Sequence, residues 1–79
     1  MAIKFTLKET LEREGLTKYA VAQAADVRRN TITDLWNSNT RSLRMDTLDA
    51  ILNTINKLSG KKYGIDAIVV YEYEDEDAH

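Results

Sequence analysis

Residues 16–37, which read LTKYAVAQAADVRRNTITDLWN, predict two short helices separated by a tight turn. Thr17 is a good N-cap, and the alanine-rich stretch after it favours a helix that ends at Ala24 or Ala25. Asp26 follows, and aspartate is one of the few non-glycine residues that tolerate a left-handed turn conformation. A second helix is expected over about residues 29–37. Two helices joined by so short a turn form a helix-turn-helix.

The apolar residues of both helices are spaced to form buried faces. The inner face of the first helix is predicted to contain Leu16, Ala20, Val21 and Ala24. The buried face of the second is predicted to contain Ile32, Leu35 and Trp36, at i, i+3 and i+4. The opposite side carries Arg28, Arg29, Asn30, Thr33 and Asn37. A polar face is therefore left for solvent or a ligand.

An amphipathic helix is expected before this pair, over about residues 6–14, because two leucines stand four apart among charged residues. Thr6 and Glu9 fit a capping box, in which the hydroxyl and the carboxylate satisfy the first free amides. Gly15 is placed to end the helix in a left-handed conformation.

A fourth helix is expected after a polar loop over residues 37–42. It spans about residues 45–58 and ends before Gly60. Its apolar stripe at helical period contains Met45, Leu48, Ile51, Leu52, Ile55 and Leu58. Four helices around one core predict a mostly α fold.

The C-terminal part of the chain changes period from helix to strand. Residues 65–74 are rich in β-branched and aromatic residues and end in strict alternation, as in a half-buried strand. Residues 2–6 alternate more weakly and are one candidate partner; the same segment of a second chain is the other. We therefore divide the chain into a helical domain over residues 1–64, a strand over 65–74 and an acidic tail over 75–79.

The net charge of −2 hides an uneven distribution. Residues 1–65 contain all 11 basic residues and seven acids, so they carry +4. Residues 66–79 contain six acids and no Lys or Arg, so they carry −6. A basic body with an acidic end is typical of nucleic-acid binding, or of a merely solubilising tail.

The composition excludes several classes of protein. The 79 residues are too few for most enzyme folds, and the absence of cysteine excludes disulfides and thiolate metal sites. The single histidine is the terminal residue His79, and there is no glycine-rich phosphate loop. We expect neither an enzyme nor a bound metal or cofactor. No signal peptide or membrane span is visible, which favours a cytoplasmic protein.

The helix pair resembles a known family. Its key positions hold a small residue in the first helix, an apolar residue after the turn, and a branched residue and a leucine in the second helix: Ala22, Val27, Ile32 and Leu35. With these positions and with residues 45–52, MDTLDAIL, the chain resembles the Cro/CI-type (XRE-type) helix-turn-helix family over about residues 4–58. Asp26, Trp36 and Ser38 stand where that family usually has glycine, glutamate and glycine.

The resemblance implies a lambda repressor-like fold and a set of DNA contacts. Arg29, Asn30 and Thr33 match the positions that read bases; arginine can pair with guanine and asparagine with adenine. Lys18 matches a position that touches the phosphate backbone or flanking bases. The surrounding residues expected to hold phosphates are Arg28, Asn37, Asn39, Thr40, Arg41 and Arg44. Asp34 would oppose a phosphate unless it pairs with Arg28 or Arg41.

The sequence therefore predicts a small, repressor-like transcriptional regulator that binds double-stranded DNA specifically. One helix-turn-helix reads few base pairs, so we expect a homodimer, assembled through the C-terminal strand. A protein-interaction module or an antitoxin-like adaptor on the same scaffold is the alternative, and the acidic C-terminus favours it modestly.

Overall fold

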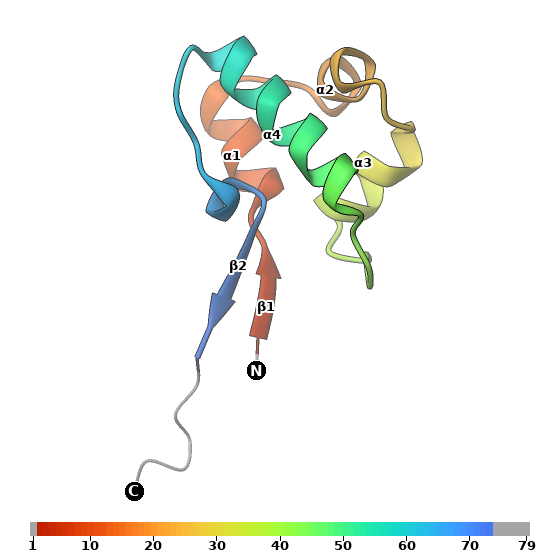
Figure 1. The fold of residues 1–79 in the computed structure, drawn as a ribbon, viewed down its shortest axis with the longest axis vertical. Helices are drawn as coiled ribbons and strands as arrows, with labels where there is room; N and C mark the ends of the chain where they lie inside the picture. The colour runs from red at the N-terminus through yellow and green to blue at the C-terminus, as the bar shows by residue number, and fades with distance from the viewer. Residues whose placement is uncertain (1, 74–79) are drawn as a thin grey trace, which may run out of the picture.

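The helices form one bundle, and a two-stranded ribbon projects from it (Figure 1). The computed structural model describes residues 2–73, and the predicted acidic tail with His79 lies outside them. The elements, in chain order, are β1 (Ala2–Phe5), α1 (Leu7–Glu14), α2 (Lys18–Ala25), α3 (Arg29–Trp36), α4 (Met45–Ser59), a 3-10 turn η1 (Ile65–Ala67) and β2 (Val69–Glu72). The expected mostly α fold with four helices and a C-terminal strand is confirmed.

The helix ends follow the predicted capping residues in three places. The Thr17 hydroxyl accepts a hydrogen bond from the Ala20 amide at 3.0 Å and so begins α2. Gly15 and Gly60 end α1 and α4 with φ values of 69° and 73°. These angles lie in the left-handed region, which glycine adopts at little steric cost.

Two residues other than glycine also adopt a left-handed backbone conformation. Asp26 has a φ of 58° in the turn between α2 and α3, and Ser38 has a φ of 61° just after α3. After Asp26, the Val27 amide donates to the carbonyl of Ala22 at 3.0 Å and closes the turn. The chain therefore keeps the turn geometry that glycine would give more cheaply.

The core is shared by all four helices and by the segment before β2. Its buried members are Leu7, Leu11, Val21, Ala22, Ile32, Leu35, Leu48, Ile51, Ile55 and Ile68. Val27 and Trp36 are only partly buried and pack against this cluster. The predicted stripes of α1 and α3 are thus largely confirmed.

The predicted stripes of α2 and α4 are wrong at four positions. Ala20 and Ala24 are exposed, and Ala22 takes their place in the core of α2. Met45 and Leu58, at the two ends of α4, are also exposed. Helical period alone assigned these four residues to the core, but in the structure they lie on the solvent-exposed surface of their helices.

The predicted capping box at the start of α1 is also wrong, because the Thr6 hydroxyl has a distant partner. It donates to the carbonyl of Asp66 at 2.7 Å, and the Thr6 amide donates to the carbonyl of Ile68 at 2.8 Å. The buried Thr10 hydroxyl donates to the carbonyl of Ala67 at 2.7 Å. These bonds anchor η1 on α1 and hold Ile68 in the core.

The C-terminal segment is part turn and part strand. The prediction of a strand over residues 65–74 is wrong in its first part, because Ile65–Ala67 forms the turn η1. The strand β2 begins at Val69 and pairs antiparallel with β1 of the same chain. Of the two candidate partners, the structure shows the N-terminal segment.

The ribbon has one apolar and one charged face. The apolar face carries Ile3, Phe5, Val69 and Tyr71, with Ile3 opposite Tyr71 and Phe5 opposite Val69. Near the bundle, Phe5 and Val69 are partly buried. Further out, Ile3 and Tyr71 are 61% and 63% exposed. On the other face, the Lys4 ammonium lies 2.6 Å from a carboxylate oxygen of Glu72.

A polar cluster fastens the chain between α4 and η1 to the end of α1. The ammonium of Lys61, at 2.7 Å, and the hydroxyl of Tyr63 both donate to one carboxylate oxygen of Glu14. These two hydrogen bonds, that of Lys61 first, hold the pKa of Glu14 below its ordinary value. The bond to Glu14 in turn raises the pKa of Lys61.

Candidate nucleic-acid interface

The exposed side of α3 carries the polar residues that the sequence predicted there. At 100° per residue, Arg29 and Thr33 lie on one flank, Asn30 and Asn37 near the centre, and Thr31 and Asp34 on the other flank. Arg29, Asn30, Asn37 and Asp34 are exposed, whereas Thr33 and Thr31 are partly buried. The buried side of the helix faces the core through Ile32 and Leu35.

The N-terminus of α3 is open. Arg28 occupies the N-cap in extended conformation, and no side chain there accepts a hydrogen bond from the first amides. The positive end of a helix attracts anions, and the exposed side chains of Arg28 and Arg29 add two full charges beside it. This end of α3 therefore presents donors and cations together.

Two aromatic rings hold cations on the same flank. The Arg29 guanidinium lies over the ring of Tyr19, 4.8 Å from its centroid. The Lys18 ammonium lies over the ring of Trp36, 4.9 Å from its centroid. Lys18, Tyr19, Arg29 and Thr33 line one small hollow of about 170 Å³ between α2 and α3. The structure thus brings together three predicted contact residues from two helices.

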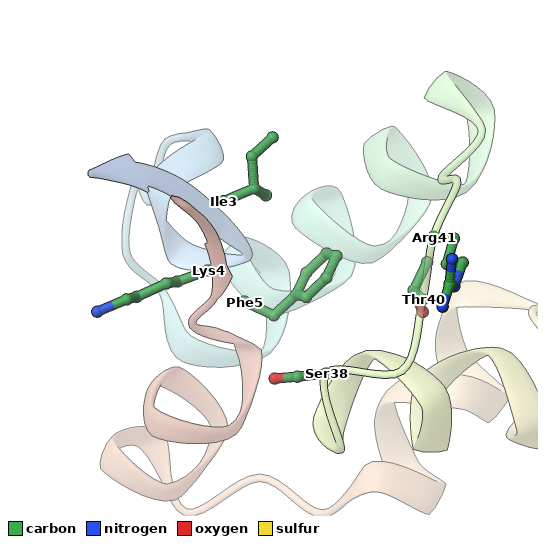
Figure 2. Close-up of a pocket in the computed structure, with 6 residues that line it drawn as sticks. All are labelled: Ile3, Lys4, Phe5, Ser38, Thr40 and Arg41. Carbon is green, nitrogen blue, oxygen red and sulfur yellow. The ribbon is translucent and has the colours of Figure 1, made fainter. Parts of the chain in front are cut away.

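The loop between α3 and α4 supplies the other predicted residues. Asn37 ends α3 as its C-cap. The backbone N–H of the exposed Asn39 donates a hydrogen bond to the backbone carbonyl of Asp34 at 2.8 Å. Arg41 is exposed on the loop, which faces Phe5 of β1 across a further hollow (Figure 2). Arg44 is the N-cap of α4, and its guanidinium lies 3.6 Å from the carboxylate of Asp46.

A third hollow, of about 380 Å³, lies on the opposite flank of α3. Thr31 and Asp34 form its α3 side, and the loop from Asn39 to Arg44 together with Thr47 of α4 forms the rest. Within residues 2–73, Asp34 makes no ion pair with Arg28 or Arg41, so the predicted pairing is not formed. Its carboxylate remains a negative charge beside the cationic loop.

Sequence reasoning missed the two aromatic supports. Tyr19 was not assigned to the site, and Trp36 was expected to be wholly core, although it is partly buried and also supports Lys18. A signal for Tyr19 was present, because a large ring stood next to Lys18 on an otherwise small or polar helix surface.

The family comparison matches the same part of the chain. The family model of the Cro/C1-type HTH DNA-binding domain matches residues 6–58, from the start of α1 to the last turn of α4. The chain belongs to the Cro/C1-type helix-turn-helix family. Searches of curated proteins and of solved structures gave no significant match.

As a Cro/C1-type domain, the chain binds DNA through the pair α2 and α3. In a helix-turn-helix the second helix enters the major groove, and here that helix is α3. Within residues 2–73, no helix is long and apolar enough to span a membrane. The same residues contain no cluster of three or more metal-binding side chains.

Proposed function

We propose that this Cro/C1-type domain is a sequence-specific regulator that represses transcription by occupying double-stranded DNA as a homodimer. One observation carries the proposal: α3 exposes Arg29 and Asn30 at its open N-terminus, within the segment that matches the family. These are the side chains that pair bidentately with guanine and adenine in the major groove.

The remaining residues divide into readers and phosphate contacts. Thr33 shares the flank of Arg29 and is proposed to contact a base next to the one that Arg29 reads. The residues proposed to hold phosphates are Lys18, Arg28, Asn37, Asn39, Arg41 and Arg44. Lys18 lies beside the flank of Arg29, whereas the loop residues Asn39, Arg41 and Arg44 lie on the opposite flank. Arg28 and Asn37 lie at the two ends of α3.

The homodimer is proposed to assemble through β2. A single helix-turn-helix reads one half-site, and two copies read half-sites about 34 Å apart. Within residues 2–73, β1 and β2 pair only with each other, so each retains an open edge. The exposed pair of Ile3 and Tyr71 extends the apolar face away from the core. Pairing with a second copy would protect such a surface from unspecific association.

The dimer is tested by measuring the mass of the protein in solution. Light scattering after size exclusion should give twice the chain mass for the wild type, and the single chain mass for Tyr71→Lys at the same concentration. Leu58→Lys is the matched control, because Leu58 is an exposed apolar residue on α4 rather than on the ribbon. A wild type that stays monomeric at high concentration, or an effect of Leu58→Lys equal to that of Tyr71→Lys, contradicts this assembly.

DNA reading is tested by selection from a random pool, followed by mobility shifts at two salt concentrations. The expected result is a recovered site with two symmetric halves, bound more tightly than random DNA. Arg29→Ala should reduce discrimination at one or two base positions, while its affinity for random DNA changes much less. Equal losses on selected and random DNA would remove the base-reading role of Arg29.

The adaptor on the same scaffold is the competing outcome of this experiment. If the wild type shifts neither selected nor random DNA at low salt, the regulator proposal fails.

A further inference from the structure

We propose that Tyr19 is a positioning residue that orients Arg29 for base reading, so that a ring on α2 helps to set the specificity of α3. This inference rests on the proposed function, because it assumes that Arg29 reads a base. Tyr19 itself lies outside the set of contact residues argued above.

The geometry joins two helices through one cation–π pair. Tyr19 is the second residue of α2, and Arg29 is the first residue of α3. The Arg29 guanidinium stands 4.8 Å from the centroid of the Tyr19 ring, which is within the range of a cation–π contact. The ring is 55% exposed, so it forms a surface platform rather than part of the core.

The platform restricts a side chain that otherwise has many conformations. A free arginine samples several rotamers, and a bidentate bond to guanine needs the guanidinium plane in one orientation. Stacking on a ring that is fixed to the neighbouring helix removes part of that freedom before DNA arrives. Arg29 has no ion-pair partner within residues 2–73, so the ring is its principal support there.

The neighbouring pair shows why the effect should be specific to Arg29. Lys18 is held in a similar way, but by Trp36, a partly buried residue of α3. Removal of the Tyr19 ring therefore leaves Lys18 and its support in place. Because Tyr19 lies outside the buried cluster, its loss should also leave the fold intact.

The test is a double-mutant cycle on the site recovered by selection. Affinities of the wild type, Tyr19→Ala, Arg29→Ala and the double variant are measured on that site and on versions changed at each base. Tyr19→Ala should lower discrimination about two- to five-fold, at the base read by Arg29 only. In the Arg29→Ala background the same change should have no further effect.

Two further measurements separate positioning from other roles. Tyr19→Phe keeps the ring and should retain full discrimination, whereas a role of the hydroxyl on a phosphate would be lost. In the free protein, the Arg29 side-chain protons should show an upfield ring-current shift in NMR spectra that disappears in Tyr19→Ala. That shift needs no DNA.

The outcomes distinguish the inference from the proposed function. Unchanged discrimination in Tyr19→Ala, or losses that add to those of Arg29→Ala, overturns the positioning role. Discrimination lost in Tyr19→Phe overturns it as well. If the wild type selects no DNA, the proposed function fails and takes the base-reading part of this inference with it; the ring-current shift would then report the contact alone.

Discussion

At the scale of single residues, two turns of this domain have a residue with a side chain where glycine would be easier. Asp26 and Ser38 both have positive φ values, 58° and 61°. Both stand at positions where the Cro/CI-type family usually has glycine. Left-handed backbone costs an L-residue roughly 1–2 kcal/mol, although aspartate recovers part of this through local hydrogen bonds. Ser38 is therefore the clearer site of residual strain.

Replacing Ser38 by glycine should stabilise the domain. The relief of left-handed strain exceeds the extra entropy of glycine in the unfolded chain, so we expect a gain of about 0.5–1 kcal/mol. Urea denaturation of Ser38→Gly measures it. Ser42→Gly is the control, because Ser42 lies in the same loop without a positive φ and should lose stability. A loss in Ser38→Gly as large as in Ser42→Gly would contradict the strain.

Removing the carboxylate of Glu14 should make stability less dependent on acidic pH. Its pKa is lowered in the folded state, so its contribution is present above the ordinary glutamate value of about 4.5 and is lost as the pH falls through the folded pKa. Glu14→Gln should therefore be clearly less stable than the wild type at about pH 7, and this gap should be smaller at about pH 3, which lies below the ordinary glutamate pKa, because the charge contribution of Glu14 is lost as its carboxylate becomes protonated.

Denaturation curves at both pH values give this difference. Glu12→Gln is the comparison variant, since Glu12 is exposed on the same helix. A constant gap between Glu14→Gln and the wild type across the acidic range would show that the cluster acts through packing and not through charge.

At the scale of elements, α2 contributes a small residue to the core that it shares with α3. Ala22 is 2% exposed and belongs to the core cluster, while Ala24 on the same helix is exposed. A small side chain lets the two helices approach closely, and this approach places Tyr19 beside Arg29. The spacing of the helices therefore bears on stability and on DNA reading at once.

Enlarging Ala22 should separate the two helices. Ala22→Leu adds volume to a filled core, and overpacking of this kind costs about 1–3 kcal/mol. Thermal unfolding should show a lower midpoint for Ala22→Leu and almost no change for Ala24→Leu. Equal midpoints for the two variants would mean that the helix pair is not closely packed at Ala22.

Elements whose determinants are local could be predicted from the sequence. Thr17, Gly15 and Gly60 fix helix ends through neighbouring backbone, and the structure confirms them. The hydrogen bond of the Thr6 hydroxyl could not be predicted, because its acceptor, the Asp66 carbonyl, lies 60 residues away. Within the site, helical period alone was enough to predict which residues of α3 lie on its exposed, polar side.

Contacts between elements were beyond that reasoning. The contact of Tyr19 with Arg29 depends on how α2 and α3 pack. Helical period did not assign Ala22 to the core, whereas the family resemblance singled out this position as one for a small residue. The turn η1 was missed because it also depends on contacts between elements. Ile65 begins the apolar run that continues into β2, but the hydroxyls of Thr6 and Thr10 donate to the Asp66 and Ala67 carbonyls and hold this part of the chain on α1 as a turn.

At the scale of the whole molecule, charge is arranged by region. The basic residues around α3 include Arg28, Arg29, Arg41 and Arg44, whereas β2 of the ribbon lies within residues 66–79, which contain six acids and no Lys or Arg. DNA attracts the first group and repels the second. We therefore expect the ribbon to point away from the duplex when α3 lies in the groove.

Arg41 should contribute to DNA binding without reading sequence. If its guanidinium neutralises one phosphate, Arg41→Ala should lower the slope of log affinity against log salt by about 0.9. Affinity should fall to a similar degree on selected and random DNA. Lys57→Ala is the control, because Lys57 lies in the last turn of α4, at the end of that helix remote from α3 (Figure 1). An unchanged slope in Arg41→Ala would exclude the phosphate contact.

The pairing of β1 with β2 also sets an order of assembly during synthesis. β1 leaves the ribosome before any helix does, yet its partner is the last element described, with Ala2 opposite Glu72. The four helices can therefore pack around their core while β1 is still unpaired and Phe5 is still exposed. Because the partner strand lies at the far end of the described chain, we expect closure of the ribbon and burial of Ile68 to be the final step of assembly. The strand that is made first is completed last.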